Sequence, residues 1–145
     1  MTSSSLGALG ELYAAAYLEQ LGYRLVAANF TIPVGRNRRG AVIKAEIDLV
    51  AYDGDTLCFV EVKSRSSDWF APPQVNVDLR KRRQITRAAR AYRKMLGIDN
   101  QPHRYDVVTV ILAGDSTPQI ELLRNFWTEA SLSKRRWQFE PFYLT

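Results

Sequence analysis

The pattern of hydrophobic and polar positions predicts one helix, three strands, a second helix and one or two further strands. A proline-free apolar stretch after a run of serines predicts a helix from Leu6 to Leu21, and its apolar positions cover most of the circumference, so it should be mostly buried. Gly22 ends this helix, and β-branched and aromatic residues then predict a strand from Tyr23 to Ile32. A loop with three arginines, Val34 to Val42, follows.

The clearest strands are Ile43 to Tyr52 and Thr56 to Ser64, and the Asp-Gly-Asp sequence between them is typical of a β-hairpin. Side chains alternate between the two faces of a strand, so the register of the hairpin decides which residues meet. A turn made of the last two residues, Gly-Asp, places Asp48 directly opposite Glu61. A turn made of the first two, Asp-Gly, places Glu46 opposite Glu61 and makes Asp48 its diagonal neighbour.

Both registers bring Asp48, Glu61 and Lys63 to one face of the hairpin. Carboxylates that face each other across two strands repel, so this placement requires a compensating charge. Lys63 is one candidate, and a divalent cation is another, because Mg²⁺ is commonly held by one or two carboxylates. The alternative is a solvated face of ordinary ion pairs. The apolar residues around these three make both strands look central, and the cost of burying charge favours a functional role.

Glu11 is a candidate third carboxylate. Its neighbours three, four and seven positions along the predicted helix are Ala14, Ala15 and Leu18, so this acid lies on an apolar face. The alternative is a partly exposed flank on which Glu11 only favours the positive end of the helix dipole. Periodicity alone favours neither interpretation.

The second predicted helix is strongly basic. The stretch 80–94 holds eight basic residues among fifteen and no acid, and its apolar residues recur at helical spacing. The opposite face carries four cations: Arg83, Arg87, Arg90 and Lys94. Lys81 falls beside the apolar stripe and is predicted to lean toward the sheet. Because no acid is interleaved with the cations, this face favours phosphate binding over an ordinary solvated surface.

The last part of the chain returns to strand character. His103 to Leu112 predicts a strand, and Gln119 to Leu123 predicts a short edge strand after Pro118. The element order fits an α/β fold with a mixed sheet flanked by helices. Six large aromatic residues lie within 126–145. They predict a packed cap or a contact between two copies of the chain rather than a platform for base stacking.

The amino-acid composition excludes some kinds of site and indicates the kind of partner. At 145 residues the chain is the size of one domain, and a single cysteine, Cys58, and a single histidine, His103, exclude a disulfide framework and a Cys/His zinc site. The net charge is +5, and the whole basic excess lies in the second half, so a polyanion such as nucleic acid is the expected partner. No apolar run is long enough to span a bilayer, which predicts a soluble cytoplasmic protein with no membrane partner.

Two segments carry a family resemblance. Glu46 to Val50, followed after a turn by Phe59 to Lys63, resembles the PD-(D/E)XK nuclease superfamily, in which an aspartate on one strand precedes Glu-X-Lys on the next. The fuller pattern resembles the YraN-like, endonuclease-related family over about residues 7 to 126. The further matching residues are Gly10, Glu11, Gly22, Tyr23, Asn29, Lys81 and the run 104–108. The chain departs from the family at Ala45, where glycine is usual, and in its longer basic loop.

The resemblance implies a restriction-endonuclease-like α/β core in the order α-β-β-β-α-β over residues 1–126. Residues 127–145 lie outside the resemblance, and their aromatic content predicts an extension packed on the same domain. It also implies a metal-dependent endonuclease that hydrolyses phosphodiester bonds of DNA, and selectivity for particular DNA structures stays open. Asp48, Glu61 and the Val62 carbonyl would ligate Mg²⁺ or Mn²⁺, while Lys63 would orient water and offset phosphate charge. Glu11 would orient a metal-bound water or occupy a second metal site.

The expected DNA contacts are sequence-independent and use the phosphate backbone. The candidate residues are Lys81, Arg83, Arg87, Arg90 and Lys94 on the second helix, and Arg36, Arg38 and Arg39 in the basic loop. The alternative function is a non-catalytic nucleic-acid-binding adaptor, against which the joint presence of Asp48, Glu61 and Lys63 argues. An RNA endonuclease that works by general acid and base residues is disfavoured, because His103 is the only histidine.

Overall fold

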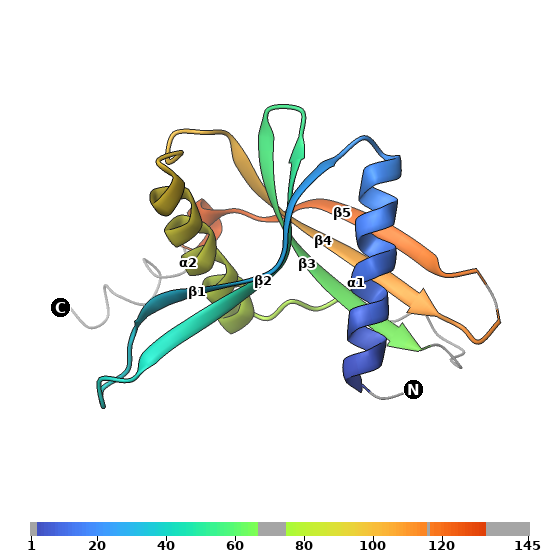
Figure 1. Cartoon of the computed structure of the whole chain (residues 1–145), viewed down its shortest axis with the longest axis horizontal. Helices are drawn as coiled ribbons and strands as arrows, with labels where there is room; N and C mark the ends of the chain where they lie inside the picture. The colour runs from blue at the N-terminus through green and yellow to red at the C-terminus, as the bar shows by residue number, and fades with distance from the viewer. Residues whose placement is uncertain (1–2, 67–74, 116, 133–145) are drawn as a thin grey trace.

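A computed structural model describes residues 3–66, 75–115 and 117–132. The elements of this part of the chain are α1 (Ser3–Gln20), β1 (Arg24–Arg36), β2 (Val42–Asp53), β3 (Thr56–Ser66), α2 (Leu79–Leu96), β4 (His103–Leu112) and β5 (Gln119–Trp127). The strands form a sheet in the order β1-β2-β3-β4-β5 (Figure 1). Only β3 and β4 pair in parallel, through the crossover that contains α2. The predicted α/β fold with a mixed sheet is therefore confirmed.

The two helices cover opposite faces of the sheet. On one face, α2 places Ile85, Ala88 and Tyr92 in a core with Ile47 and Phe59. An Asp78 N-cap, whose side chain accepts from the Lys81 amide, begins α2, and Gly97 with φ of 68° ends it. The first turn of α2 lies near β3, the central strand, because the Lys81 ammonium approaches Glu61 there.

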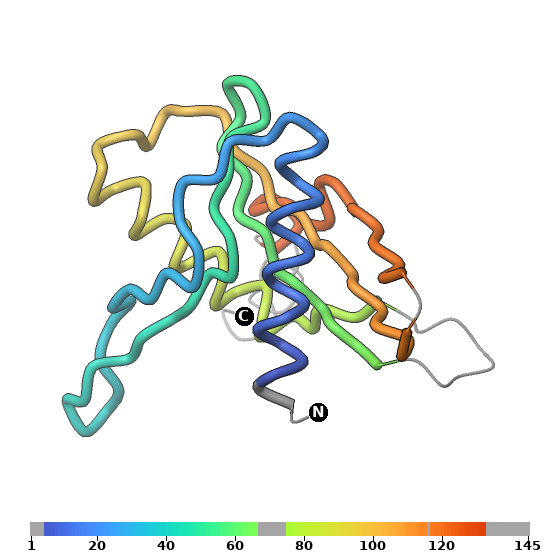
Figure 2. Tube along the Cα trace, turned by 45° about the vertical axis from the view of Figure 1, so that its right-hand side comes forward, coloured from blue at the N-terminus to red at the C-terminus, as the bar shows by residue number. Residues whose placement is uncertain are grey.

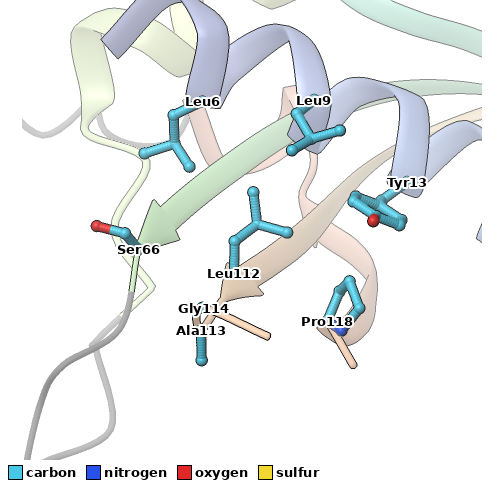
Figure 3. Close-up of a pocket in the computed structure, with 8 residues that line it drawn as sticks. All are labelled: Leu6, Leu9, Tyr13, Ser66, Leu112, Ala113, Gly114 and Pro118. Carbon is cyan, nitrogen blue, oxygen red and sulfur yellow. The ribbon is translucent and has the colours of Figure 1, made fainter. Parts of the chain in front are cut away.

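The expectation that the first helix is mostly buried is wrong. From Ser5 to Gln20 on α1, only one narrow stripe is buried, Gly10, Ala14 and Leu18, and this stripe packs toward β3 and β4. Leu12 on the outer side is 69% exposed. The apolar residues of α1 surround the helix, but the sheet offers a surface to one side only, so the others stay outside. An apolar cavity of about 280 Å³ also lies along α1, lined in part by Leu9 and Leu112 (Figure 3).

The basic segment expected as a loop from Val34 to Val42 is shorter as a loop than predicted, because its two ends belong to β1 and β2, which corrects that prediction. The β1–β2 ladder continues to the pair Arg36↔Val42 and absorbs the proline at position 33 with a register shift. Only 37–41 turn, closed by the Asn37 side chain, which accepts from the amides of Arg39 and Ala41. The two strands form an arm, defined as residues 33–45, that projects away from the other strands in both views (Figures 1 and 2).

The last strand is longer than predicted. β5 continues past Leu123 to Trp127, one residue beyond the boundary at 126, with a register shift between Tyr105 and Val107. Trp127 is 3% exposed and its indole N–H donates to the Thr86 hydroxyl, so it is part of the core. The aromatic residues at 137, 139, 142 and 143, with the subunit contact expected of them, lie outside the described residues. Among the described helices, none is long and apolar enough to cross a membrane.

Candidate metal centre

The site forms where β2 and β3 separate. Their ladder runs from Asp53↔Thr56 to Leu49↔Val60, which confirms the register with Asp48 next in line opposite Glu61. Beyond this pair β2 turns into the arm, while β3 continues beside β4 (Figure 1). The Asp48 carboxylate then takes the place of the missing ladder partner, since the Val62 amide donates to Asp48 Oδ2 over 2.8 Å.

The same divergence exposes a backbone acceptor. Within a β-strand, the N–H and the C=O of one residue point toward the same neighbouring strand, and in an antiparallel pair both form hydrogen bonds to it. The Val62 amide points to Asp48, and the Val62 carbonyl therefore faces the same side, toward the space that β2 leaves. This orientation suits the expected role of Val62 as a backbone ligand.

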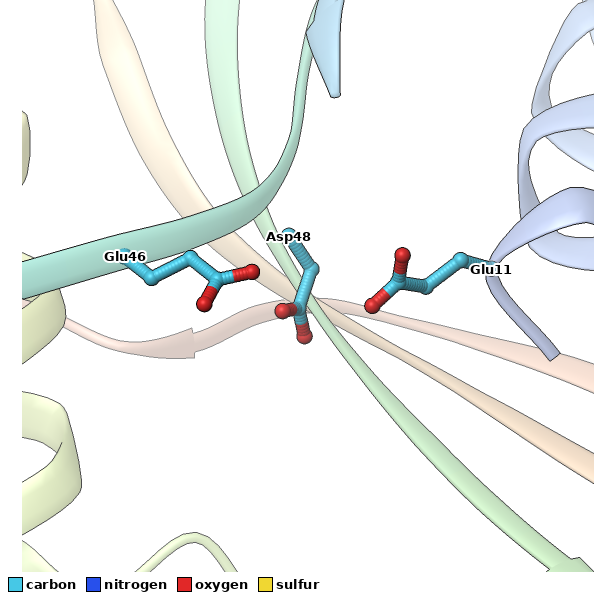
Figure 4. A group of neighbouring side chains, drawn as sticks. All are labelled: Glu11, Glu46 and Asp48. Carbon is cyan, nitrogen blue, oxygen red and sulfur yellow. The ribbon is translucent and has the colours of Figure 1, made fainter. Parts of the chain in front are cut away.

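Three carboxylates come together in front of β2. Oxygens of Glu11, Glu46 and Asp48 lie within 4.8 Å of one another, with Glu11 reaching over from α1 (Figure 4). Glu11 thus lies beside Asp48, which favours the first of the two interpretations that its position in the helix left open. Glu46 was absent from the predicted site residues. Its alternation with Asp48 on β2 was the available signal, since both point to one face of the strand.

Burial makes this group of acids costly to ionise together. Desolvation, followed by the hydrogen bond and negative charge of Asp48, raises the pKa of Glu61 to about 8, against the opposing charges of Lys81 and Lys63. Desolvation also raises the pKa of Glu11, and Asp48 and Glu46 add to this, while a hydrogen bond with Asn29 opposes it. A set of carboxylate oxygens with excess negative charge is what a hard divalent cation requires.

The catalytic candidates share one cavity of about 430 Å³. It is lined by Leu6, Gly7, Glu11, Asp48, Glu61, Val62, Lys63, Ser64 and Lys81. Glu61 is only 5% exposed. The Lys81 ammonium lies 3.8 Å from Glu61 Oε2. Lys81 leans toward the sheet as predicted, but its observed contact is with a site carboxylate. Part of the negative charge is thus balanced by the first turn of α2.

A close approach of α1 to β3 brings Glu11 to this cavity. A Cβ added at Gly10 would overlap the Ser64 hydroxyl and lie 2.7 Å from the Ser64 Cβ, so only glycine fits there.

We expect Gly10→Ala to lower the free energy of unfolding by about 1–3 kcal/mol through overpacking. Urea unfolding measures this change. Gly7→Ala is the control, because a Cβ at Gly7 meets nothing within 4 Å. Failure of Ser64→Gly to rescue Gly10→Ala would contradict the explanation.

The raised pKa of Glu61 predicts a pH-dependent stability in the absence of metal. With a folded pKa of about 8, above the ordinary 4.5, the folded state binds more protons than the unfolded state between these values. The free energy of unfolding should therefore fall as pH rises through this window. Glu61→Gln removes this dependence. In EDTA the free energy of unfolding of the variant should therefore exceed that of the wild type by on the order of a few kcal/mol above pH 8, and the two should be equal near pH 4.5.

Urea unfolding of both proteins in EDTA at several pH values tests this prediction. Glu121→Gln is the control, because Glu121 is exposed on β5 and its replacement should leave the pH dependence of the wild type in place. A Glu61→Gln protein whose stability falls with pH as steeply as that of the wild type would contradict the origin we give to the slope.

The other basic candidates lie outside this cavity. Arg83 and Lys94 are exposed on α2, whereas Arg87 donates to the Val34 carbonyl over 2.8 Å. Arg38 and Arg39 lie in the turn at the tip of the arm. The remaining arginine of the arm, at position 36, ends β1 and donates to the Gly40 carbonyl over 2.7 Å.

The expectation of a cationic face without acidic partners is wrong at Arg90. Glu129, which follows β5, accepts from Arg90 Nε over 2.7 Å and from Arg93 over 3.1 Å. It also lies 2.7 Å from His103 Nε2 and accepts from the Tyr105 hydroxyl. Burial opposes ionisation of Glu129, but hydrogen bonds with His103, Arg90 and Tyr105 lower its pKa to about 2. Glu129 therefore fastens the chain after β5 to α2.

The fold and the site define an α/β protein with a carboxylate-and-lysine site at the divergence of a β-hairpin. The family model described as "Uncharacterised protein family UPF0102" matches residues 10–110, and the chain belongs to this family, as the YraN-like resemblance indicated. A UPF0102 protein of Geobacter sulfurreducens is 42% identical over 83% of this chain and 86% of its own length. Another, from Moorella thermoacetica, is 40% identical over 77% of this chain and 85% of its own length.

Proposed function

We propose that the protein is a metal-dependent DNA endonuclease of the PD-(D/E)XK type. The observation that carries the proposal is the convergence of Asp48, Glu61 and Lys63 on one cavity at the point where β2 leaves β3. An acid on one strand and Glu-X-Lys on the next is the arrangement that the superfamily resemblance requires. We expect the protein to meet DNA in the cytoplasm.

The donor set fits Mg²⁺ or Mn²⁺. Asp48 and Glu61 would supply carboxylate oxygens and Val62 its carbonyl, and such hard oxygen ligands suit both cations. The bound cation would supply Lewis-acid polarisation of the scissile phosphate. Glu11 and Glu46 approach Asp48 from two elements and would extend the ligand set toward a second cation.

The two lysines of the cavity have different positions and therefore different proposed roles. Lys81 lies 3.8 Å from Glu61 and would balance the charge of that ligand once its carboxyl group is ionised. Lys63, two residues after Glu61 on β3, would orient the attacking water and offset charge on the phosphate. Exposed arginines, including Arg83, would hold the backbone of the DNA independently of its sequence.

A non-catalytic nucleic-acid-binding adaptor is the competing function. It requires the basic surface but gives no reason to bury Glu61 next to Asp48, which costs folding free energy. The cost of this buried acid pair favours the enzyme over the adaptor.

The direct test is a cleavage assay on linear, nicked, flapped and branched DNA, with Mg²⁺, Mn²⁺ or EDTA, and with RNA of the same sequence. We expect products with either cation and none with EDTA, with DNA preferred to RNA. Binding to all of these nucleic acids without cleavage of any, at any concentration of either cation, would favour the adaptor.

A further inference from the structure

A third cavity lies on the other side of the first turns of α2, between this helix and the arm. Its volume is about 510 Å³, within the range of roughly 300–1,000 Å³ that is usual for ligand sites. It is lined by Ile43, Leu79, Arg80, Arg83, Gln84 and Arg87. We call it the arm groove. None of its lining residues lines the metal-site cavity, so it is a separate feature of the surface.

The arm groove is held open by direct contacts between its two walls. The Arg87 guanidinium donates to the Val34 carbonyl on β1, and it packs so closely that a Cβ added at Gly35 would lie 3.0 Å from its terminal nitrogen. This contact ties the arm to α2. The groove is therefore preformed, and a ligand would meet it without the cost of ordering the arm.

The chemistry of the arm groove combines cations with apolar surface. The Arg80 and Arg83 side chains are exposed and make no side-chain hydrogen bond or ion pair with any residue in the described ranges. No acid lines the groove. Ile43 and Leu79 are half-buried and supply an apolar wall, and Gln84 adds an amide with donors and acceptors. The ligand should thus carry negative charge, a flat apolar surface and hydrogen-bonding edges.

An unpaired nucleotide meets all three requirements. Its phosphate pairs with guanidinium groups, and its free base can stack on a guanidinium plane or an apolar side chain and present its edge to an amide. A base-paired duplex keeps its bases stacked inside and would offer only phosphates to the arginines. The apolar wall and Gln84 therefore favour single-stranded nucleic acid over intact duplex.

The arm groove also lies close to the metal centre along the chain. Arg80 directly precedes Lys81, which reaches Glu61. Ile43 precedes Asp48 by five residues on β2, which is roughly 17 Å of extended strand. One strand of nucleic acid could therefore pass from the metal-site cavity across the first turn of α2 into the groove.

We infer that the arm groove binds unpaired nucleotides next to the scissile bond, so that the preferred DNA carries a single-stranded flap. This inference rests on the proposed function for the nature of the substrate. It assigns a role to Arg80, Ile43, Leu79 and Gln84, and it makes the groove the part of the surface that distinguishes flapped DNA from plain duplex.

The test measures binding rather than cleavage, in EDTA, by fluorescence anisotropy of labelled DNA. The probes are a blunt duplex, the same duplex with a short unpaired flap, and that flap with abasic sites. We expect the wild type to bind the flapped DNA roughly tenfold more tightly than the blunt duplex and to lose this preference with the abasic flap. The same affinity for all three probes would overturn the inference, and this comparison needs no variant.

A second experiment compares two double variants, R80Q/R83Q in the groove and R38Q/R39Q at the tip of the arm. Both variants remove two positive charges. We expect R80Q/R83Q to abolish the preference for the flap, and R38Q/R39Q to weaken binding of all probes while leaving the preference intact. An equal loss for blunt and flapped DNA in R80Q/R83Q would mean that these arginines contact only duplex phosphates, which would contradict the inference.

Failure of the inference and failure of the proposed function have different signatures. A flap preference without any metal-dependent cleavage would support nucleotide binding in the groove and contradict the proposed activity. Cleavage without a flap preference would support the activity and contradict nucleotide binding in the groove.

Discussion

Replacement of Asp48 by asparagine is expected to abolish metal-dependent cleavage while leaving DNA binding in EDTA unchanged. The loss should be on the order of 10³-fold or more, because a ligand to a catalytic cation supports several kcal/mol of transition-state stabilisation. The fold should survive, since the asparagine oxygen still accepts from the Val62 amide as Asp48 Oδ2 does. Single-turnover cleavage and anisotropy measurements in EDTA report the two quantities separately.

Asp55→Asn provides the matched control for this variant. Asp55 is exposed in the turn of the same hairpin, and its replacement removes the same charge without touching the cavity. We expect it to cleave at the wild-type rate. Full activity in purified Asp48→Asn would exclude Asp48 from the metal centre, whereas a loss of DNA binding in EDTA would point to a structural defect. Glu61→Gln should lose cleavage to a similar extent, which tests the second ligand.

The hairpin at the centre of the site could be predicted from local rules. Alternation of side chains placed Asp48, Glu61 and Lys63 on one face in either register, and only the choice between two turns was open. The pair Asp53↔Thr56 settles that choice in favour of Asp48 opposite Glu61. Local geometry sufficed here because a tight turn fixes the pairing of every residue that follows it.

Features that depend on contacts between distant parts of the chain could not be predicted in the same way. The burial of α1 depends on how much sheet surface it meets, so the apolar circumference led to a wrong expectation at Leu12. Glu129 lies far along the chain from Arg90, and no periodicity in the basic helix indicates an acid that arrives from beyond β5. Periodicity in the sequence predicts the local structure of a segment, whereas its burial and its ion pairs depend on which other segments pack against it.

The contribution of Glu46 falls between these cases. Its position on the same face as Asp48 was apparent from alternation, but its nearness to Glu11 depends on where α1 packs on the sheet. The close packing of Gly10 against the Ser64 side chain sets α1 near β3. This glycine, rather than any acidic motif, thus helps to bring the Glu11 carboxylate to Asp48 and Glu46.

Lys63→Ala is expected to lose cleavage by about 10²–10⁴-fold while retaining the metal, because the ammonium acts on water and phosphate rather than on the cation. Calorimetry with Mn²⁺ should show an affinity equal to or higher than that of the wild type, since a positive charge near the ligands has been removed. The fold should persist, because Lys81 still lies 3.8 Å from Glu61 and balances its charge. Lys44→Ala, on the exposed face of the arm, is the matched control and should cleave normally. Loss of Mn²⁺ binding in Lys63→Ala, with Lys44→Ala unaffected, would show that Lys63 supports the ligands instead of the reaction.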